Sequence, residues 1–207
     1  MEKTFSIKEA LSYGWNTLKQ NPVQWILLIV GTSFLVASPS MVFDAVSHGR
    51  APVSSGLLSL ITGLASIVLQ IGITWILLAH IDGREWTWRD LYRHYNLFLN
   101  FLVASILFGL IVAGGFILFI VPGIIFAIMF GQYSYVIVDK GVGPIEALKQ
   151  SKRITKGVRW KMFGFHIVSF FVVILGFVAL LVGALAAIPV TTIAAVWVYR
   201  RIEQQSA

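Results

Sequence analysis

Hydrophobic positions fall into four long blocks that contain no Lys, Arg, Asp or Glu. These blocks are residues 20–43, 51–81, 94–138 and 162–199. A helix rises about 1.5 Å per residue and the hydrocarbon core of a bilayer is roughly 30 Å thick, so about 20 apolar residues make one crossing. The first two blocks have the length of one span each. The third and fourth are long enough for two spans, which predicts that each folds back as a helical hairpin.

Six membrane-spanning helices follow from this pattern, and they predict an all-α integral membrane protein. The expected spans are Pro22–Val46, Leu57–His80, Leu97–Leu118, Phe119–Val138, Met162–Leu181 and Gly183–Tyr199. The composition agrees, because 57% of the residues are hydrophobic, 12% are charged and the mean hydropathy is +0.83. A water-soluble globule of 207 residues could not bury that much apolar surface.

The cationic residues predict an orientation. With the N-terminus in the cytoplasm, six spans place fifteen of the sixteen Lys and Arg residues inside and leave only Arg50 outside. Cytoplasmic loops are enriched in Lys and Arg, so we expect a multi-pass protein of the cytoplasmic (inner) membrane with both termini in the cytoplasm. A five-span alternative would translocate Arg200 and Arg201. Because the net charge of +7 lies beside membrane spans, it indicates anionic lipids as partners and not nucleic acid.

Three short polar segments, one before each pair of spans, open like helices. The first places Ser6 three residues before Glu9, the spacing of a capping box. The second repeats this spacing with Thr87 and Asp90, and the third begins with Pro144, a residue favoured at the first helical position. We therefore interpret residues 1–207 as a single transmembrane domain of three units, 5–80, 86–138 and 144–201. Each unit is expected to be a cytoplasmic interfacial amphipathic helix followed by a helical hairpin. Coincidence of common helix-start residues is the alternative explanation.

The third polar segment, Pro144 to Lys156, gathers its cations within about a third of a helical circumference. Together with a neighbouring arginine they form the expected headgroup-binding set: Lys149, Lys152, Arg153, Lys156 and Arg159. A basic amphipathic helix suits the headgroup plane, where its cations meet lipid phosphates. A solvated basic face that only follows the positive-inside rule is the alternative.

Residues that could carry catalysis are scarce, and we expect no enzyme, no cofactor and no metal site. The chain has no cysteine, and no zinc-protease, hydrolase-elbow or phosphate-loop motif is present in the sequence. The strongest metal candidate is the polar cluster around the second cytoplasmic loop: His80, Asp82, Glu85, Asp90 and His94. Pairing of charges four residues apart on a helix surface explains that cluster more simply.

Polar side chains within the expected spans are the remaining candidates for function. The residues from which a path across the membrane could be built are Gln70, Gln132, Ser134 and His166. Hydrogen bonding between neighbouring helices is the alternative role for them. Asp44, near the outer end of the first span, lies either at the interface or at a pore mouth.

A more specific pattern runs from Gln132 to Gly157. Its parts are a Tyr-rich span end, Val138-Asp139, Glu146-Ala147-Leu148, Ser151 and Thr155-Lys156-Gly157. In these residues the chain resembles the family of prokaryotic membrane proteins related to the membrane domain of glycerophosphoryl diester phosphodiesterase. The resemblance implies a polytopic helical membrane domain, and it does not imply a phosphodiesterase, because no residues are left over for the soluble catalytic barrel.

The expected function is therefore that of a non-catalytic, lipid-associated binding or scaffold module. Small residues four positions apart, such as Gly109 and Ala113, would allow close packing against a second copy or another membrane protein. The alternative is a small transporter or channel for a small molecule or lipid-like substrate. Polar groups that converge on one cavity would favour transport, and polar groups that pair off between neighbours would favour a scaffold.

Overall fold

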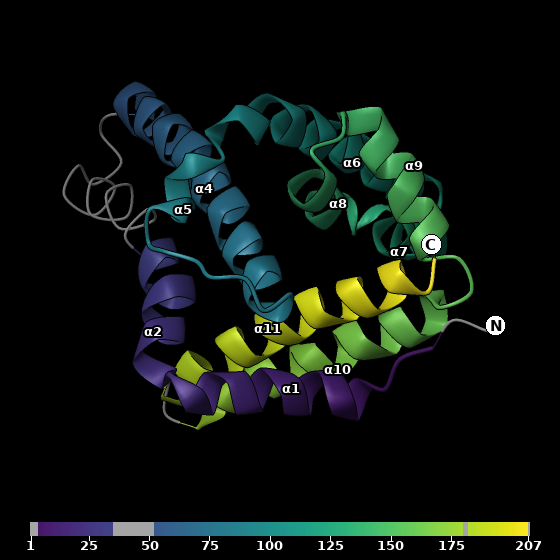
Figure 1. Ribbon diagram of the computed structural model, residues 1–207. Coiled ribbons are helices and arrows are strands. Elements are labelled where there is room, and N and C mark those ends of the chain that lie inside the picture. The colour runs from purple at the N-terminus through teal and green to yellow at the C-terminus, as the bar shows by residue number, and fades with distance from the viewer. Residues whose placement is uncertain (1–3, 35–51, 180–181, 207) are drawn as a thin grey trace.

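The computed structural model describes residues 4–34, 52–179 and 182–206, and over these residues the chain is helical, without a β-strand. The order along the chain is shown in Figure 1. The α-helices are α1 (Ile7–Gln20), α2 (Pro22–Ile26), α4 (Pro52–Ile81), α5 (Asp90–Arg93), α6 (Phe98–Leu118), α7 (Ile120–Phe130), α8 (Tyr133–Lys140), α9 (Pro144–Ile154), α10 (Arg159–Val178) and α11 (Val182–Gln204). A π-helical turn, η1 (Leu27–Gly31), continues α2, and a 3₁₀ turn, η2 (Tyr95–Leu97), precedes α6.

Five helical segments are long and apolar enough to cross a membrane, so the chain is an all-helical, multi-pass membrane protein. They are Gly56–Ile81, Asp90–Leu118, Ile120–Lys140, Arg159–Val178 and Gly183–Gln204. Each coincides with one of the last five spans expected from the sequence. Of the first expected span, the structure describes the apolar helical part Pro22–Phe34. The rest of that span lies outside the described residues, as do Asp44 and Arg50.

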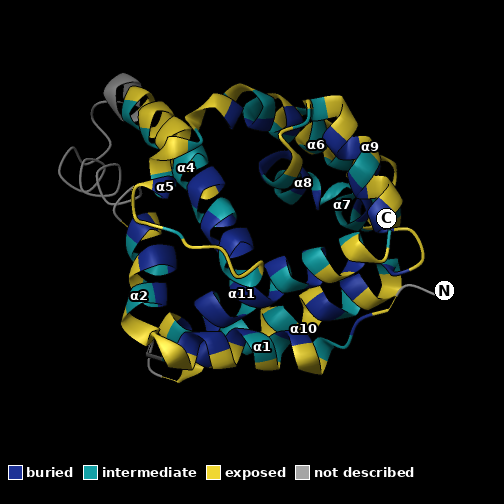
Figure 2. Cartoon of the chain, viewed as in Figure 1, coloured by how far each residue is buried: buried dark blue, intermediate teal, exposed yellow. Residues whose placement is uncertain are grey.

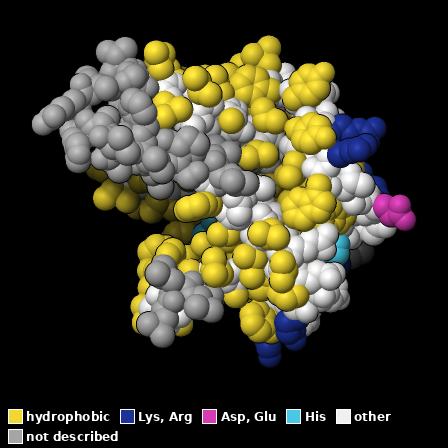
Figure 3. Space-filling model, turned by 90° about the vertical axis from the view of Figure 1, so that its left-hand side faces the viewer, with side chains coloured by type: hydrophobic (Ala, Val, Ile, Leu, Met, Phe, Trp, Pro, Cys, Tyr) yellow, Lys and Arg dark blue, Asp and Glu magenta, His cyan; other side chains and the backbone are white. Residues whose placement is uncertain are grey.

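Large apolar side chains cover the outside of this bundle. Ile117, Val178 and Phe170 expose 85%, 76% and 62% of their surface, a pattern that water would oppose and hydrocarbon favours. In Figure 2 the buried side chains gather on the helix faces turned toward the middle of the molecule. Figure 3 shows one outer face, which is largely hydrophobic, with Lys and Arg only at its edges.

The short polar segments pack in a repeating way. Helix α5 packs on α4, α9 packs on α8, and α1 packs on α11 at the other end of the chain. The helices α5 and α9 thus each lie against the last helix of the preceding expected unit, and α1 lies against the last helix of the third unit. Ser6 accepts the N–H of Glu9 at 3.3 Å, as the capping box predicts, and Pro144 takes the first turn of α9. The second segment differs from expectation, because its α-helix is a single turn that ends at His94.

Two of these contacts depend on glycine. A Cβ on Gly14 of α1 would lie 2.3 Å from the carbonyl oxygen of Val190 in α11. A Cβ on Gly72 of α4 would lie 2.1 Å from the carbonyl oxygen of Leu91 in α5. Only a residue without a side chain allows the two backbones to approach so closely.

Candidate functional site

A polar cavity of about 600 Å³ lies between η1, α4, α8 and α11. Its polar lining consists of hydroxyl and amide side chains from α4, α8, α11 and the two residues directly after η1: Thr32, Ser33, Ser59, Thr62, Ser66, Gln70, Thr74, Ser134 and Thr192. No charged side chain occurs among the described residues that line this cavity. Ser59, Ser66 and Gln70 are exposed and Thr32 and Thr74 are buried, so the chain gathers uncharged hydrogen-bonding groups along a cavity that is open on one side.

Helix α4 supplies the longest wall of the cavity. Its lining residues recur every three or four positions, which places them on one face of the helix. From Ser59 to Leu77 this face is about 27 Å long, against a hydrocarbon core of roughly 30 Å. The face of α4 that lines the cavity is thus long enough to cross most of a bilayer, and its polar side chains lie between Ser59 and Thr74.

The helices that complete the cavity depart from regular α-helix beside it. The π-helical turn η1 lies directly before Thr32 and Ser33. In α11, Pro189 lies inside the helix between two lining residues, Ile188 and Thr192. Irregular backbone at membrane depth is tolerated where it is buried in protein or lines a water-filled cavity. Such irregularities are also frequent at functional sites.

The fourth expected span is broken between α7 and α8, at Gly131 and Gln132. Ser151 of α9 satisfies the backbone groups at the break. Its hydroxyl accepts the Gln132 N–H at 3.0 Å and donates to the Met129 carbonyl at 3.0 Å, and the Thr155 hydroxyl donates to the same carbonyl at 3.2 Å. Because residues of α9 satisfy the backbone groups at the break, a new helix, α8, can begin after it, and Ser134 of α8 lines the cavity.

A cluster of charges joins the ends of α4, α8 and α11. The Arg200 guanidinium donates to both carboxylate oxygens of Asp139, at 2.9 and 3.0 Å, and to Asp82 at 2.8 Å. Arg84 pairs with Asp82, and Lys140 pairs with Glu203, both at 2.9 Å. The side chains of Arg200 and Asp139 are only 14% and 11% exposed. Three cations and three carboxylates are therefore held together with balanced charge.

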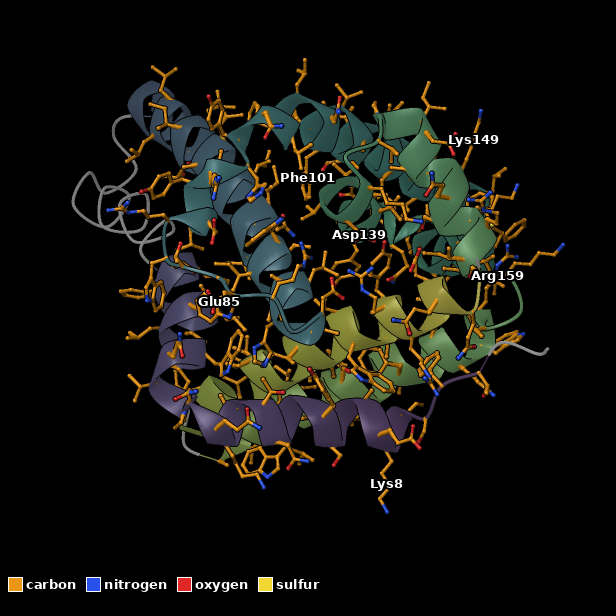
Figure 4. The ribbon with its side chains drawn as sticks, in the orientation of Figure 1. Lys8, Glu85, Phe101, Asp139, Lys149 and Arg159 are labelled. Atoms are coloured by element: carbon orange, nitrogen blue, oxygen red, sulfur yellow. The ribbon has the colours of Figure 1, made fainter. Side chains whose placement is uncertain are left out.

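This charge cluster lies one helical turn beyond the cavity. Leu77, Tyr135 and Val196 line the cavity on α4, α8 and α11, and the cluster follows about four residues later on each helix. The Tyr135 ring packs on the Tyr199 ring at 5.3 Å, and the Tyr199 hydroxyl donates to Asp139 at 2.9 Å. Figure 4 shows Asp139 near the middle of the molecule, unlike the peripheral Lys8 and Lys149. The cluster and the two tyrosine rings lie at this end of the cavity.

Two of the four expected path residues, Gln70 and Ser134, line the cavity. The other two do not. Gln132 is buried at the break before α8 and donates its backbone N–H to Ser151. His166 is on α10, where its Nδ1 lies 2.7 Å from the carbonyl oxygen of Met162.

The residues considered for a metal have other roles. Asp82 belongs to the charge cluster, and Asp90 accepts the backbone N–H of Thr87 at 2.8 Å. The His94 ring stacks on Trp75 at 4.6 Å. Across the described residues, no group of three or more His, Asp or Glu side chains is arranged to hold a metal ion.

The basic set lies on the opposite side of α9 from its packed face. Ala147, Leu148, Ser151 and Ile154 are buried, whereas Lys149, Lys152, Arg153 and Lys156 are exposed. Arg159 begins α10 and lines a second cavity of about 280 Å³ whose other walls are apolar: Val121, Ile124, Ile125, Ile128, Trp160 and Phe163. The Nε atom of Arg159 is buried without a hydrogen-bond partner.

Sequence reasoning missed the charge cluster, although its signal was present. The second and fourth expected spans are each followed within two residues by an aspartate and then a glycine, in Asp82-Gly83 and Asp139-Lys140-Gly141. Both glycines have positive φ, 70° and 63°, and so end the helices at matching places. The sixth span ends in Arg200 instead, which supplies the opposite charge.

Similar curated proteins occur in mycobacteria. The chain is 25% identical over 226 aligned positions to an uncharacterised protein of Mycobacterium bovis and to two of Mycobacterium tuberculosis. These alignments cover 96% of this chain and 69% of each relative. No protein-family model matches the chain, and no solved structure matches it. The names of the relatives state no activity.

Proposed function

We propose that this protein is a small transporter or channel that passes a small polar solute through the cavity between η1, α4, α8 and α11. The observation that carries the proposal is the convergence of polar side chains from these helices on one cavity, with Gln70 and Ser134 among them. Discontinuous helices that meet at the middle of the membrane are the usual setting of transporter binding sites. Simple helix-to-helix pairing would have spread these groups over separate contacts.

The proposal includes six crossings, arranged as three hairpins, with both termini in the cytoplasm. The two ends of the described chain support an even number of crossings. The Thr4 backbone N–H donates to Gln205 Oε1 at 2.8 Å, and Gln205 Nε2 donates to the Thr4 carbonyl at 2.9 Å. Together with the one-sided placement of Lys and Arg, this contact favours the cytoplasmic side for both ends.

In this arrangement the cavity is closed toward the cytoplasm by the charge cluster around Arg200 and Asp139. Passage then requires that these ion pairs separate while α4, α8 and α11 move apart. We also propose that the protein makes and breaks no covalent bond, and that it is related to the membrane domain of glycerophosphoryl diester phosphodiesterase, as residues 132–157 indicate.

The test fills the cavity in purified protein reconstituted into liposomes. A Cβ on Gly63 of α4 or on Gly109 of α6 meets no atom within 4 Å, so either helix accepts a larger side chain. Gly63 lines the cavity and Gly109 does not. Glycerol, rubidium and phosphate serve as probes, and we expect the wild type to pass at least one of them faster than protein-free liposomes. Gly63→Trp should abolish that flux and Gly109→Trp should retain it. Equal flux with and without protein for every probe would refute the proposal.

Lipid association is a second candidate function, supported by a separate observation. The cavity at Arg159 combines one partly buried arginine, whose Nε atom has no hydrogen-bond partner, with apolar walls, which matches the phosphate and acyl chain of an anionic phospholipid. The exposed lysines of α9 precede it in the chain. The protein would hold lipid here and act as a binding or scaffold module.

Native mass spectrometry tests this second candidate. We expect the triple variant Lys149→Gln, Lys152→Gln and Lys156→Gln to retain less phosphatidylglycerol than the wild type, because each removed cation loses about 1 kcal/mol of attraction to an anionic headgroup. The matched control removes three exposed cations elsewhere: Lys8, Lys19 and Arg89. If both triple variants lost the same amount of phosphatidylglycerol, retention would depend on the total positive charge of the protein and not on a site at α9.

A further inference from the structure

Five of the eight Ser and Thr hydroxyls that line the cavity between η1, α4, α8 and α11 already donate a hydrogen bond within their own helix. Each of several lining Ser and Thr residues donates its single proton to a carbonyl of its own helix: Thr32 to Leu28, Ser33 to Ile29, Thr62 to Ser59, Ser66 to Gly63 and Thr192 to Ile188. A hydroxyl has one donor and two acceptor sites. These oxygens can therefore still accept hydrogen bonds, but they have no proton left to donate.

The cavity is consequently rich in acceptors. The Gln70 amide adds two donor hydrogens and one acceptor oxygen. A ligand that satisfies this lining must donate several hydrogen bonds and accept a few. Removing a polar ligand from water without such partners would be costly.

Acceptor oxygens can bind either a cation or a neutral ligand that donates hydrogen bonds, and the charge of the lining distinguishes these two classes of ligand. A cation would need a compensating carboxylate, and the described lining residues include none. The charge cluster at the closed end holds three cations and three carboxylates and so attracts neither sign. An anion would likewise need a compensating cation, and the described lining residues include no Lys or Arg. Neutral ligands remain.

The volume of the cavity limits the size of the ligand. About 600 Å³ is within the range of small-molecule sites and far above the roughly 30 Å³ that one water occupies. We propose that the ligand is a small, uncharged polyol, a chain or ring of carbons with a hydroxyl on most of them. This proposal rests on the proposed transport function and names its substrate class.

The test measures flux of xylitol, rubidium and phosphate into liposomes that contain the full-length protein. We expect xylitol to enter faster than in protein-free liposomes, and rubidium and phosphate to enter at the protein-free rate. Faster entry of rubidium or phosphate without xylitol would overturn the polyol assignment and leave transport standing. No entry of any probe would overturn the transport function, and the ligand class would then be decided by the binding measurement below.

A matched pair of variants links the flux to the cavity. Thr191 and Thr192 are neighbours in α11, and each donates to a carbonyl one turn earlier, but only Thr192 lines the cavity. We expect Thr192→Val to slow xylitol entry about fivefold, as the loss of one hydrogen bond predicts. Thr191→Val should leave the rate unchanged. Equal rates for the two variants would contradict the assignment.

Saturation-transfer NMR on protein in nanodiscs separates binding from passage. Xylitol signals should respond to the wild type and weaken with Gly63→Trp, whose side chain occupies the cavity. A response without flux would keep the ligand class and refute transport. No response, in a protein that melts like the wild type, would refute the ligand class.

Discussion

Arg200 shows how much one side chain decides in this protein. It is the only residue that contacts both Asp82 after α4 and Asp139 of α8 within the described charge cluster, and it is mostly buried. A planar guanidinium can serve two carboxylates at fixed angles, which a lysine cannot do. Removing it would leave two carboxylates without their shared cation. The residue after it, Arg201, is exposed.

We expect Arg200→Leu to destabilise the protein by about 3 kcal/mol, because an uncompensated buried carboxylate is costly. Arg201→Leu should change stability by no more than about 0.5 kcal/mol, as is usual at an exposed position. Thermal unfolding in detergent, followed by the fluorescence of the seven tryptophans, measures both. Equal melting temperatures would mean that the charge cluster contributes little to stability.

At the scale of elements, the contacts between short and long helices determine the arrangement. Gly72 lets α5 lie directly on α4, and Gly14 does the same for α1 on α11. Ser151 performs the corresponding task for α9, where hydrogen bonds to the broken span replace the glycine contact. Two of the three contacts thus use a glycine, and the third uses hydrogen bonds.

Gly72→Ala should destabilise the protein by about 1–3 kcal/mol, because the new methyl group meets the Leu91 backbone and forces α5 away. Gly114→Ala in α6 is the matched control, since a Cβ there meets no atom within 4 Å. Alanine is the better helix former by about 1 kcal/mol, so the control should melt no lower than the wild type. Melting curves in detergent decide between these outcomes, and a Gly72→Ala variant as stable as the control would contradict the close approach.

At the scale of the molecule, α1 packs on α11 and so joins the beginning of the chain to its end. The same region holds the bonds between Thr4 and Gln205. In Figure 1 the helices surround a middle region that is bordered by the C-terminal end of α4, by α8 and by the length of α11. The charge cluster lies where the ends of α4, α8 and α11, which are distant in the sequence, meet.

Cysteine labelling tests the threading of the chain, and the natural sequence has no cysteine to remove. A membrane-impermeant maleimide should label Thr4→Cys and Gln205→Cys only in inside-out vesicles. Phe119→Cys, in the exposed connection between α6 and α7, should react only in right-side-out vesicles. Labelling of Thr4→Cys and Gln205→Cys from opposite sides would refute an even number of crossings.

Residue patterns predicted the elements better than the site. The last five expected spans match long apolar helices because twenty apolar residues in a row have few other stable conformations. Gln70 and Ser134 were selected because polar residues are rare in spans, and both reach the cavity. Gln132 and His166 were selected for the same reason, and they point elsewhere, since rarity does not reveal which way a side chain faces.

The sequence by itself determined that this chain is helical and lives in a membrane, because hydrophobicity and helix length are local properties that need no partner. Only the tertiary structure decided which polar groups meet. The break at Gln132, satisfied by Ser151, and the pairing of Arg200 with Asp82 and Asp139 join residues separated by up to 118 positions. Such contacts depend on how helices pack, and no local pattern contains that information.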